Sequence, residues 1–203
     1  MWIDGGTHAR EWITPAVVTW LIKEVVEFDH KHPHFTGILD WYFLPVLNPD
    51  GYEFSRTKNR NWRKTRSCHV TQTCAENCIG TDPNRNWGYK WKNRDHPCDF
   101  ETYGGPAPFS EVENRNVRDF ILGHKNEIKF FNSLHSNGQM VILPWCYIDS
   151  KPEGYHKMKE MAETVRTSYT KSYCLQLPRE DIRVYAYMFF LAGRISFKLC
   201  IWV

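Results

Sequence analysis

Segments with the character of buried β-strands alternate along this chain with segments patterned as amphipathic helices. Four apolar segments close in polar or glycine-containing turns and predict strands at 2–4, 40–47, 129–134 and 140–144. Three stretches with apolar residues at helical spacing predict helices at about 14–28, 110–121 and 154–169. This alternation indicates an α/β domain built on a mixed, largely parallel sheet.

Local signals predict where several of these elements begin and end. Thr14, followed by a proline, predicts a helix N-terminus with Thr14 as the N-cap. Ser110 and Glu113 have the spacing of a capping box at the start of another helix. Residues 48–51 predict a turn that closes the second strand, and residues 52–105 show little periodicity. A long irregular region inside a compact domain is usually functional, so we expect the site there.

Size and charge exclude several classes of protein. The chain has 203 residues, which suits one domain, and its 42% hydrophobic and 24% charged residues exclude a disordered chain. Lys and Arg number 26 against 23 Asp and Glu, so the net charge of +3 is too small to indicate a nucleic-acid partner. No apolar run approaches the roughly 20 residues that cross a bilayer. The first residues also lack the features of a signal peptide. We expect a soluble protein that binds neither nucleic acid nor membrane.

Seven cysteines are present, and four of them lie in one segment: Cys68, Cys74, Cys78 and Cys98. Such a cluster indicates either disulfides in an oxidising compartment or a metal knuckle. The spacings do not fit the CxxC pairs of a zinc ribbon, which favours disulfides.

His8 and Glu11 stand three residues apart, directly after a predicted strand, where both can face one metal ion. A third nitrogen ligand would complete a His2Glu zinc site with an open position. His135 is the candidate, because it ends an apolar strand at a point where sheets present side chains to ligands. The alternative is structural: Glu11 would serve the helix N-terminus, and His135 would be an ordinary hydrogen-bonded side chain.

Two runs rich in Arg and Asn lie between these motifs, at 59–66 and 82–87. One interpretation is solvated surface charge, or Arg stacked on Trp. The other is that Arg side chains converge on a carboxylate, which a guanidinium binds with two hydrogen bonds.

Five motifs in order closely resemble the zinc metallocarboxypeptidases of the carboxypeptidase A/B type. They are Gly6-Thr7-His8-Ala9-Arg10-Glu11-Trp12-Ile13, Asn48-Pro49-Asp50-Gly51-Tyr52, Asn59-Arg60-Asn61-Trp62-Arg63-Lys64-Thr65-Arg66-Ser67, Asp82-Pro83-Asn84-Arg85-Asn86-Trp87 and Ser133-Leu134-His135-Ser136. The resemblance covers residues 1–173 and implies a partial catalytic domain, truncated at both ends, whose central sheet carries helices on both faces. Residues 174–203 are expected to form a divergent C-terminal tail.

The resemblance also implies roles for single residues. One Zn²⁺ per chain would be bound by His8, Glu11 and His135. Arg63 matches the arginine that polarises the scissile carbonyl. Four further positions match residues that contact substrate: Arg10, Arg60, and the pair Asn84 and Arg85 that holds the terminal carboxylate. The implied function is release of C-terminal amino acids from peptides.

By the same resemblance, Cys78 and Cys98 form the family disulfide, and the protein is expected to be a secreted monomer. A bond between Cys68 and Cys74 is a guess. The pairing of Cys146, Cys174 and Cys200 stays open.

The chain departs from the family after about residue 173. The family's general-base glutamate lies in a Glu-Leu-Arg-Asp segment that has no counterpart here. Glu180 and Asp181 are the carboxylates of the divergent tail and are expected to be solvated. The alternative function is therefore an inactive relative or truncated isoform that binds zinc and peptide C-termini without hydrolysis. The preferred C-terminal side chain also stays open.

Overall fold

The structure is a computed structural model that describes residues 1–27, 33–69, 75–92, 95–138, 140–145, 147–168 and 198–202. The chain divides into two compact units. The first consists of Met1–Gly5, Ile13–Pro45 and Ile128–Val203, and the second of Gly6–Trp12 and Val46–Glu127.

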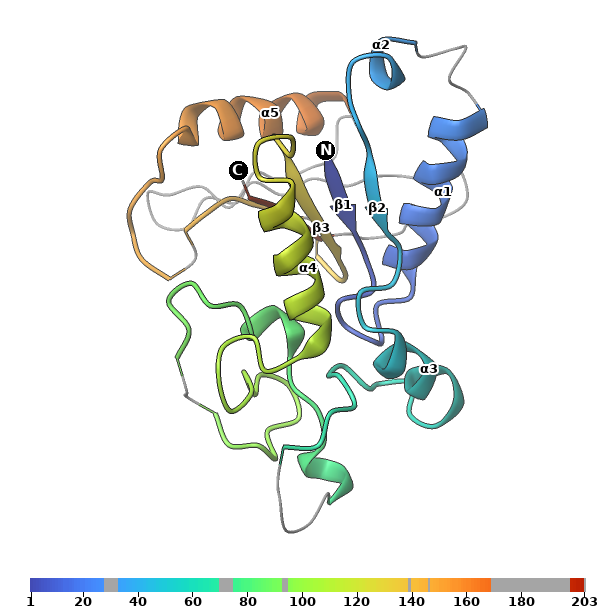
Figure 1. The fold of residues 1–203 in the computed structure, drawn as a ribbon, viewed down its shortest axis with the longest axis vertical. Coiled ribbons are helices and arrows are strands. Elements are labelled where there is room, and N and C mark those ends of the chain that lie inside the picture. The colour runs from blue at the N-terminus through green and yellow to red at the C-terminus, as the bar shows by residue number, and fades with distance from the viewer. Residues whose placement is uncertain are drawn as a thin grey trace. The chain divides into compact units, whose positions relative to one another are not determined.

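A five-stranded sheet forms the centre of the first unit (Figure 1). Its strands are β1 (Trp2–Asp4), β2 (Tyr42–Leu44), β3 (Phe131–His135), β4 (Met140–Ile142) and β5 (Lys198–Trp202), in the order β2-β1-β3-β5-β4. β1 is parallel to both β2 and β3, and β4 is parallel to β5. The pair of β3 and β5 is antiparallel. The prediction of a mixed, largely parallel sheet is confirmed.

Three helices belong to this unit: α1 (Ile13–Glu27), α2 (Pro33–Thr36) and α5 (Tyr155–Ser168). α1 packs on the sheet through a core of Ile3, Val17, Val18 and Leu134. The helix begins at Ile13, so Thr14 lies fully buried within its first turn. The prediction that Thr14 is the N-cap is therefore wrong, because Thr14 is the second residue of the helix.

The opposite face of the sheet carries the side chains that alternate with this core. Because successive side chains of a strand point to opposite faces, Trp2 and Asp4 of β1 share a face with Phe131 and Ser133 of β3. The rings of Trp2 and Phe131 stack with centroids 6.1 Å apart. His135 ends β3 on this same face.

The second unit contains α3 (Pro49–Thr57), two 3₁₀ helices, η2 (Glu76–Cys78) and η3 (Pro83–Arg85), and α4 (Val112–Gly123). The predicted turn at 48–51 is wrong, because these residues open α3. Asn48 is its N-cap, and Asn48 Oδ1 accepts a hydrogen bond from the Gly51 amide at 3.0 Å. Pro49 is the first residue of α3, and proline at the first helical position is typical of a helix start.

The predicted capping box at α4 is also wrong. The N-cap is Glu111, and it makes no side-chain capping bond. The Ser110 hydroxyl accepts a hydrogen bond from Asn86 Nδ2 at 2.8 Å and donates to Glu111 Oε1 at 2.9 Å. Tertiary partners therefore occupy the hydroxyl that the local pattern assigns to the helix end.

The expected disulfide between Cys78 and Cys98 is present. Cys68 is also disulfide-bonded. Cys74, Cys146 and Cys174 lie outside the described residues, as do Glu180 and Asp181. Among the helices that the structure describes, none has the length and apolar character needed to span a bilayer.

Candidate functional site

His8 and Glu11 lie in the loop that follows β1, and both side chains are buried, at 3% and 6% exposure. Gly6 has φ +65°, a backbone conformation that favours glycine, where this loop begins. His8 Nδ1 is 2.7 Å from Glu11 Oε1, so the two predicted ligands face each other. The Ala9 amide donates to the Arg63 carbonyl at 3.0 Å, which anchors the loop to the segment that carries Arg63.

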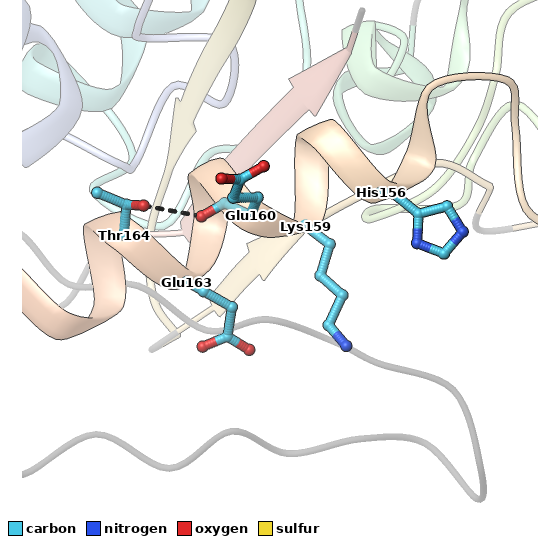
Figure 2. A pocket seen from close by; sticks show the side chains of 5 residues that line it. All are labelled: His156, Lys159, Glu160, Glu163 and Thr164. Atoms are coloured by element: carbon cyan, nitrogen blue, oxygen red, sulfur yellow. Dashed lines mark hydrogen bonds between the residues drawn. The ribbon is translucent and has the colours of Figure 1, made fainter.

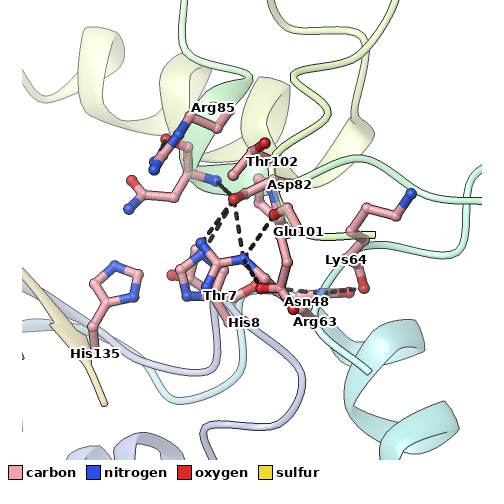
Figure 3. Close-up of polar contacts among 12 residues, drawn as sticks. Thr7, His8, Asn48, Arg63, Lys64, Asp82, Arg85, Glu101, Thr102 and His135 are labelled. Carbon is pink, nitrogen blue, oxygen red and sulfur yellow. Dashed lines mark hydrogen bonds and ion pairs between the residues drawn. The ribbon is translucent and has the colours of Figure 1, made fainter. Parts of the chain in front are cut away.

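Asp82 connects His8 to Arg63 (Figure 3). Its fully buried carboxylate accepts a hydrogen bond from His8 Nε2 at 3.2 Å through Oδ1, and one from Arg63 Nη2 at 2.8 Å through Oδ2. Burial raises the pKa of Asp82, but the charges and hydrogen bonds of His8 and Arg63 outweigh burial and hold the pKa well below its usual range.

The same contacts act on His8. Burial lowers the pKa of the imidazole, and the carboxylates of Glu11 and Asp82 more than offset that effect, so the pKa is raised. Asp82 appears in the sequence only as the first residue of an Arg-rich run. The signal that marks it is the proline that follows, because Asp82 caps η3 by accepting a hydrogen bond from the Asn84 amide at 2.8 Å.

Arg63 is 14% exposed and is held on two sides. Its Nε donates to the Glu101 carbonyl at 2.9 Å in addition to the Asp82 contacts. Its Nη1 lies 4.0 Å from Glu11 Oε1. The structure therefore brings Arg63 to the His8–Glu11 pair.

Arg10 and Arg60 both have partners of their own. Arg10 forms a two-point ion pair with Glu101, at 2.8 and 2.6 Å, and this hydrogen bonding raises the pKa of Arg10. Arg60 lies 3.9 Å from the ring centroid of Trp12 and donates to the Arg10 carbonyl at 2.7 Å. The stacked interpretation is correct for Arg60. Glu101 lies in an irregular segment without any sequence signal that marks it.

Asn84 and Arg85 lie on η3, directly after Asp82. Arg85 is exposed, and its Nη1 donates to the Asn84 carbonyl at 3.1 Å. Within the part of the chain that the structure describes, Arg85 forms no ion pair with a carboxylate. Its guanidinium is thus accessible to an anion from outside the protein.

Other members of the first Arg-rich run are structural. The buried Lys64 donates from Nζ to the Asp99 carbonyl at 2.8 Å, and burial lowers its pKa. Arg66 lies over the rings of Phe54 and Trp62, at 3.6 and 4.5 Å from their centroids. The run therefore divides into residues that face the site and residues that hold the loop.

His135 ends β3 in the first unit and is 2% exposed. Its Nε2 is 3.4 Å from Ser133 Oγ, which in turn donates to Asp4 Oδ1 at 2.6 Å. Among the described residues, His8, Glu11 and His135 are a buried group that could hold a metal ion. Two imidazoles and one carboxylate are a donor set that suits Zn²⁺.

A separate pocket lies along one side of α5 (Figure 2). Its lining side chains are all on this helix: His156, Lys159, Glu160, Glu163 and Thr164. The Thr164 hydroxyl donates to the Glu160 carbonyl, a bond within the helix. The pocket contains no residue predicted from the sequence to bind zinc or substrate.

Comparison with known proteins identifies the family. The sequence model of the zinc carboxypeptidase family matches residues 1–193. The chain is 41% identical over 165 residues to carboxypeptidase B of Astacus astacus, and this match covers 80% of this chain and 53% of that protein. It is 40% identical over 174 residues to carboxypeptidase A2 of Mus musculus, covering 83% of this chain and 40% of that protein.

Solved structures agree and confirm the predicted fold class. The crystal structure of thrombin activatable fibrinolysis inhibitor matches with a TM-score of 0.75 and 35% identity, over 83% of this chain and 43% of that one. Carboxypeptidase A from Helicoverpa armigera matches with a TM-score of 0.73 and 28% identity, over 91% of this chain and 46% of that one. The chain spans about half or less of the length of these relatives. It belongs to the zinc carboxypeptidase family.

Proposed function

We propose that this chain binds one Zn²⁺ through His8, Glu11 and His135 and acts on the C-terminal ends of peptides. The observation that carries the proposal is the buried donor set of two histidines and one glutamate. Ligand atoms of two imidazoles and one carboxylate lie within 4.8 Å of one another, and a His2Glu donor set suits Zn²⁺ with an open fourth position, which favours a metal-binding role.

The sheet register supports the same three ligands. β1 and β3 are parallel neighbours, and Asp4 lies opposite Ser133. Both strands therefore end at the same edge, where the His8 loop begins and where His135 lies. In α/β sheets, ligands bind outside the carboxyl ends of the strands.

Bound zinc would act as a Lewis acid and lower the pKa of a bound water. Next to the zinc, the chain itself would supply the guanidinium of Arg63 as a hydrogen-bond donor. The contacts to Asp82 and Glu101 occupy Nε and Nη2, so Nη1 is the group that can donate to a carbonyl oxygen as negative charge develops there. A donor fixed in advance by a buried carboxylate needs no reorganisation during the reaction.

Asn84 and Arg85 would hold the substrate's terminal carboxylate. An exposed guanidinium binds a carboxylate with two parallel hydrogen bonds, and the neighbouring amide adds a neutral donor. Arg10 and Arg60, which are already paired within the protein, would contribute further substrate contacts at the edge of this surface.

Binding without hydrolysis is the second candidate. The observation that favours it is that the sequence contains no Glu-Leu-Arg-Asp segment, which in the family carries the general base. General acid–base help is worth about 10²–10⁴-fold in rate, so a chain without that group would bind substrate and turn over slowly.

Three further features belong to the proposal. Residues 1–173 would form the catalytic part of the chain, with 174–203 as a divergent tail. The protein would be secreted. Disulfide bonds persist in oxidising, extracellular compartments, and Cys78, Cys98 and Cys68 are disulfide-bonded. The functional form would be a monomer.

Zinc content and peptide hydrolysis test the proposal. Metal analysis of the purified 203-residue chain should give one zinc per chain, and His8→Ala or His135→Ala should lose it. His156→Ala, which changes an exposed histidine on α5, is the matched control and should keep it. Hydrolysis of a blocked dipeptide by the zinc-loaded chain supports the carboxypeptidase. Retained zinc and dipeptide binding without hydrolysis favours the second candidate, and a wild-type chain without zinc overturns both.

A further inference from the structure

A buried chain of hydrogen bonds in the first unit runs from Trp2 through Asp4 and Ser133 to His135. Trp2 Nε1 donates to Asp4 Oδ2 at 2.7 Å, and Ser133 Oγ donates to Asp4 Oδ1 at 2.6 Å. Ser133 Oγ lies 3.4 Å from His135 Nε2. All four side chains are buried, and Asp4 is fully so.

Chemistry sets the direction of each of these hydrogen bonds. An indole N–H can only donate, and an ionised carboxylate can only accept. Each oxygen of Asp4 therefore receives one hydrogen, from Trp2 at Oδ2 and from Ser133 at Oδ1. A serine hydroxyl has a single hydrogen, so Ser133 can offer only a lone pair to His135.

The ring of His135 must then donate from Nε2, which leaves the lone pair of the neutral imidazole on Nδ1. We propose that Asp4 and Ser133 are positioning residues that fix this tautomer and ring orientation, so that His135 binds zinc through Nδ1. The inference rests on the proposed zinc-binding function, and it adds a role for two residues, Asp4 and Ser133, to which the sequence motifs assign none. Partners of this kind orient metal-binding histidines and raise their basicity.

His8 also has a carboxylate partner at Nε2, but the contact is direct and needs no intermediate hydroxyl. Asp82 accepts directly from Nε2 of His8, whose Nδ1 faces Glu11. The strand register explains why His135 needs an intermediate residue. Asp4 lies opposite Ser133 in the parallel pair, two residues before His135, so the hydroxyl spans the gap between carboxylate and imidazole.

Asp4→Asn should reverse the relay without a change of size. Trp2 Nε1 can only donate, so the new amide must turn its oxygen to Trp2 and its NH₂ to Ser133. Ser133 then accepts from residue 4 and donates to His135 Nε2, which moves the imidazole hydrogen to Nδ1. Ser133→Ala removes the connection altogether, and Ser133→Thr retains the hydroxyl.

Side-chain ¹⁵N NMR of the zinc-free chain reads the tautomer directly. We expect His135 to carry its hydrogen on Nε2 in the wild type and in Ser133→Thr, and on Nδ1 in Asp4→Asn. If Asp4→Asn and Ser133→Ala both keep the wild-type tautomer, the relay is overturned. Circular dichroism and thermal unfolding establish that each variant is folded.

Zinc affinity, measured by competition with a chromophoric chelator, gives the second readout. Asp4→Asn and Ser133→Ala should weaken binding by about 10–100-fold. Ser150→Ala, an exposed serine of the same unit, is the matched control and should bind as the wild type does. A wild-type chain that binds no zinc would overturn the proposed function, and the tautomer measurement would still decide the relay. Unchanged affinity in both folded variants would overturn the relay and leave the proposed function standing.

Discussion

Asp82 accepts a hydrogen bond from Nε2 of His8 at 3.2 Å while its second oxygen holds the guanidinium of Arg63. One buried carboxylate thus connects a proposed zinc ligand to the residue proposed to stabilise the reacting carbonyl. The hydrogen bonds from His8 and Arg63, together with the charge of Arg63, offset the cost of burying that carboxylate, since an isolated buried charge is strongly unfavourable.

Asp82→Asn should weaken zinc binding by about 10–100-fold. An amide can accept from His8 or from Arg63 through its oxygen, but its NH₂ then faces the other donor, so one contact becomes repulsive. Chelator competition measures the affinity, and Asp119→Asn, at an exposed position on α4, is the control. Equal zinc affinity in Asp82→Asn and the wild type would contradict the role given to Asp82.

Arg85→Ala should weaken the binding of a blocked dipeptide by about thirtyfold, because a charged hydrogen-bonding pair contributes roughly 2 kcal/mol. Zinc content should not change. Isothermal titration calorimetry measures the binding, with Arg56→Ala on α3 as the control for loss of an exposed cation from the same unit. If Arg85→Ala binds the dipeptide as tightly as the wild type does, Arg85 does not bind the terminal carboxylate.

The sequence was sufficient to predict that certain residues of contiguous motifs lie close together. His8, Glu11 and Arg63 come together because short loops carry them, and the structure joins them through contacts of 2.7 to 4.0 Å. The partner Glu101 was not predictable. It reaches Arg10 and Arg63 from an irregular segment, and no periodicity marks a residue there.

Local patterns were least reliable where tertiary contacts compete with them. Ser110 has the sequence of a capping residue, yet Asn86 and Glu111 bind its hydroxyl. Asn48 has the sequence of a turn but caps α3. Strand β5 was not predicted at all, because its place between β3 and β4 depends on long-range pairing. The sequence of a single segment does not indicate which distant strand it pairs with or in which register.

Removal of the Cys78–Cys98 bond should lower the free energy of unfolding by about 3 kcal/mol. The bond closes a loop with a sequence separation of 20, and this estimate follows from the chain entropy that such a loop removes from the unfolded state. The double variant Cys78→Ser/Cys98→Ser avoids a free thiol, and urea denaturation measures its stability. The prediction fails if the midpoint and slope of the double variant equal those of the oxidised wild type.

Glu111 shows how the second unit fixes the segment that follows Arg63. Its fully buried side chain accepts hydrogen bonds from Thr65 Oγ1 at 2.6 Å, from Ser67 and Ser110, and from His69 Nε2 at 2.6 Å. Burial raises the pKa of Glu111, but these donors favour the charged form more strongly, so the pKa lies below its usual value.

Glu111 should therefore make stability depend on acid pH. A carboxyl whose pKa is lower in the folded than in the unfolded state contributes its full stabilisation above the unfolded value, about 4.3 for Glu, and loses it as pH falls through the folded pKa. Glu111→Gln should lower the free energy of unfolding at pH 7 by about 1–3 kcal/mol, because its NH₂ meets groups that donate to the carboxylate. The difference from the wild type should shrink as pH falls below about 4.3, where the wild type loses the charge as well. Urea denaturation from pH 7 to pH 3 measures both effects, with Glu53→Gln on the exposed side of α3 as the control. A constant difference across this pH range would show that the carboxylate of Glu111 is not the group that its four donors stabilise.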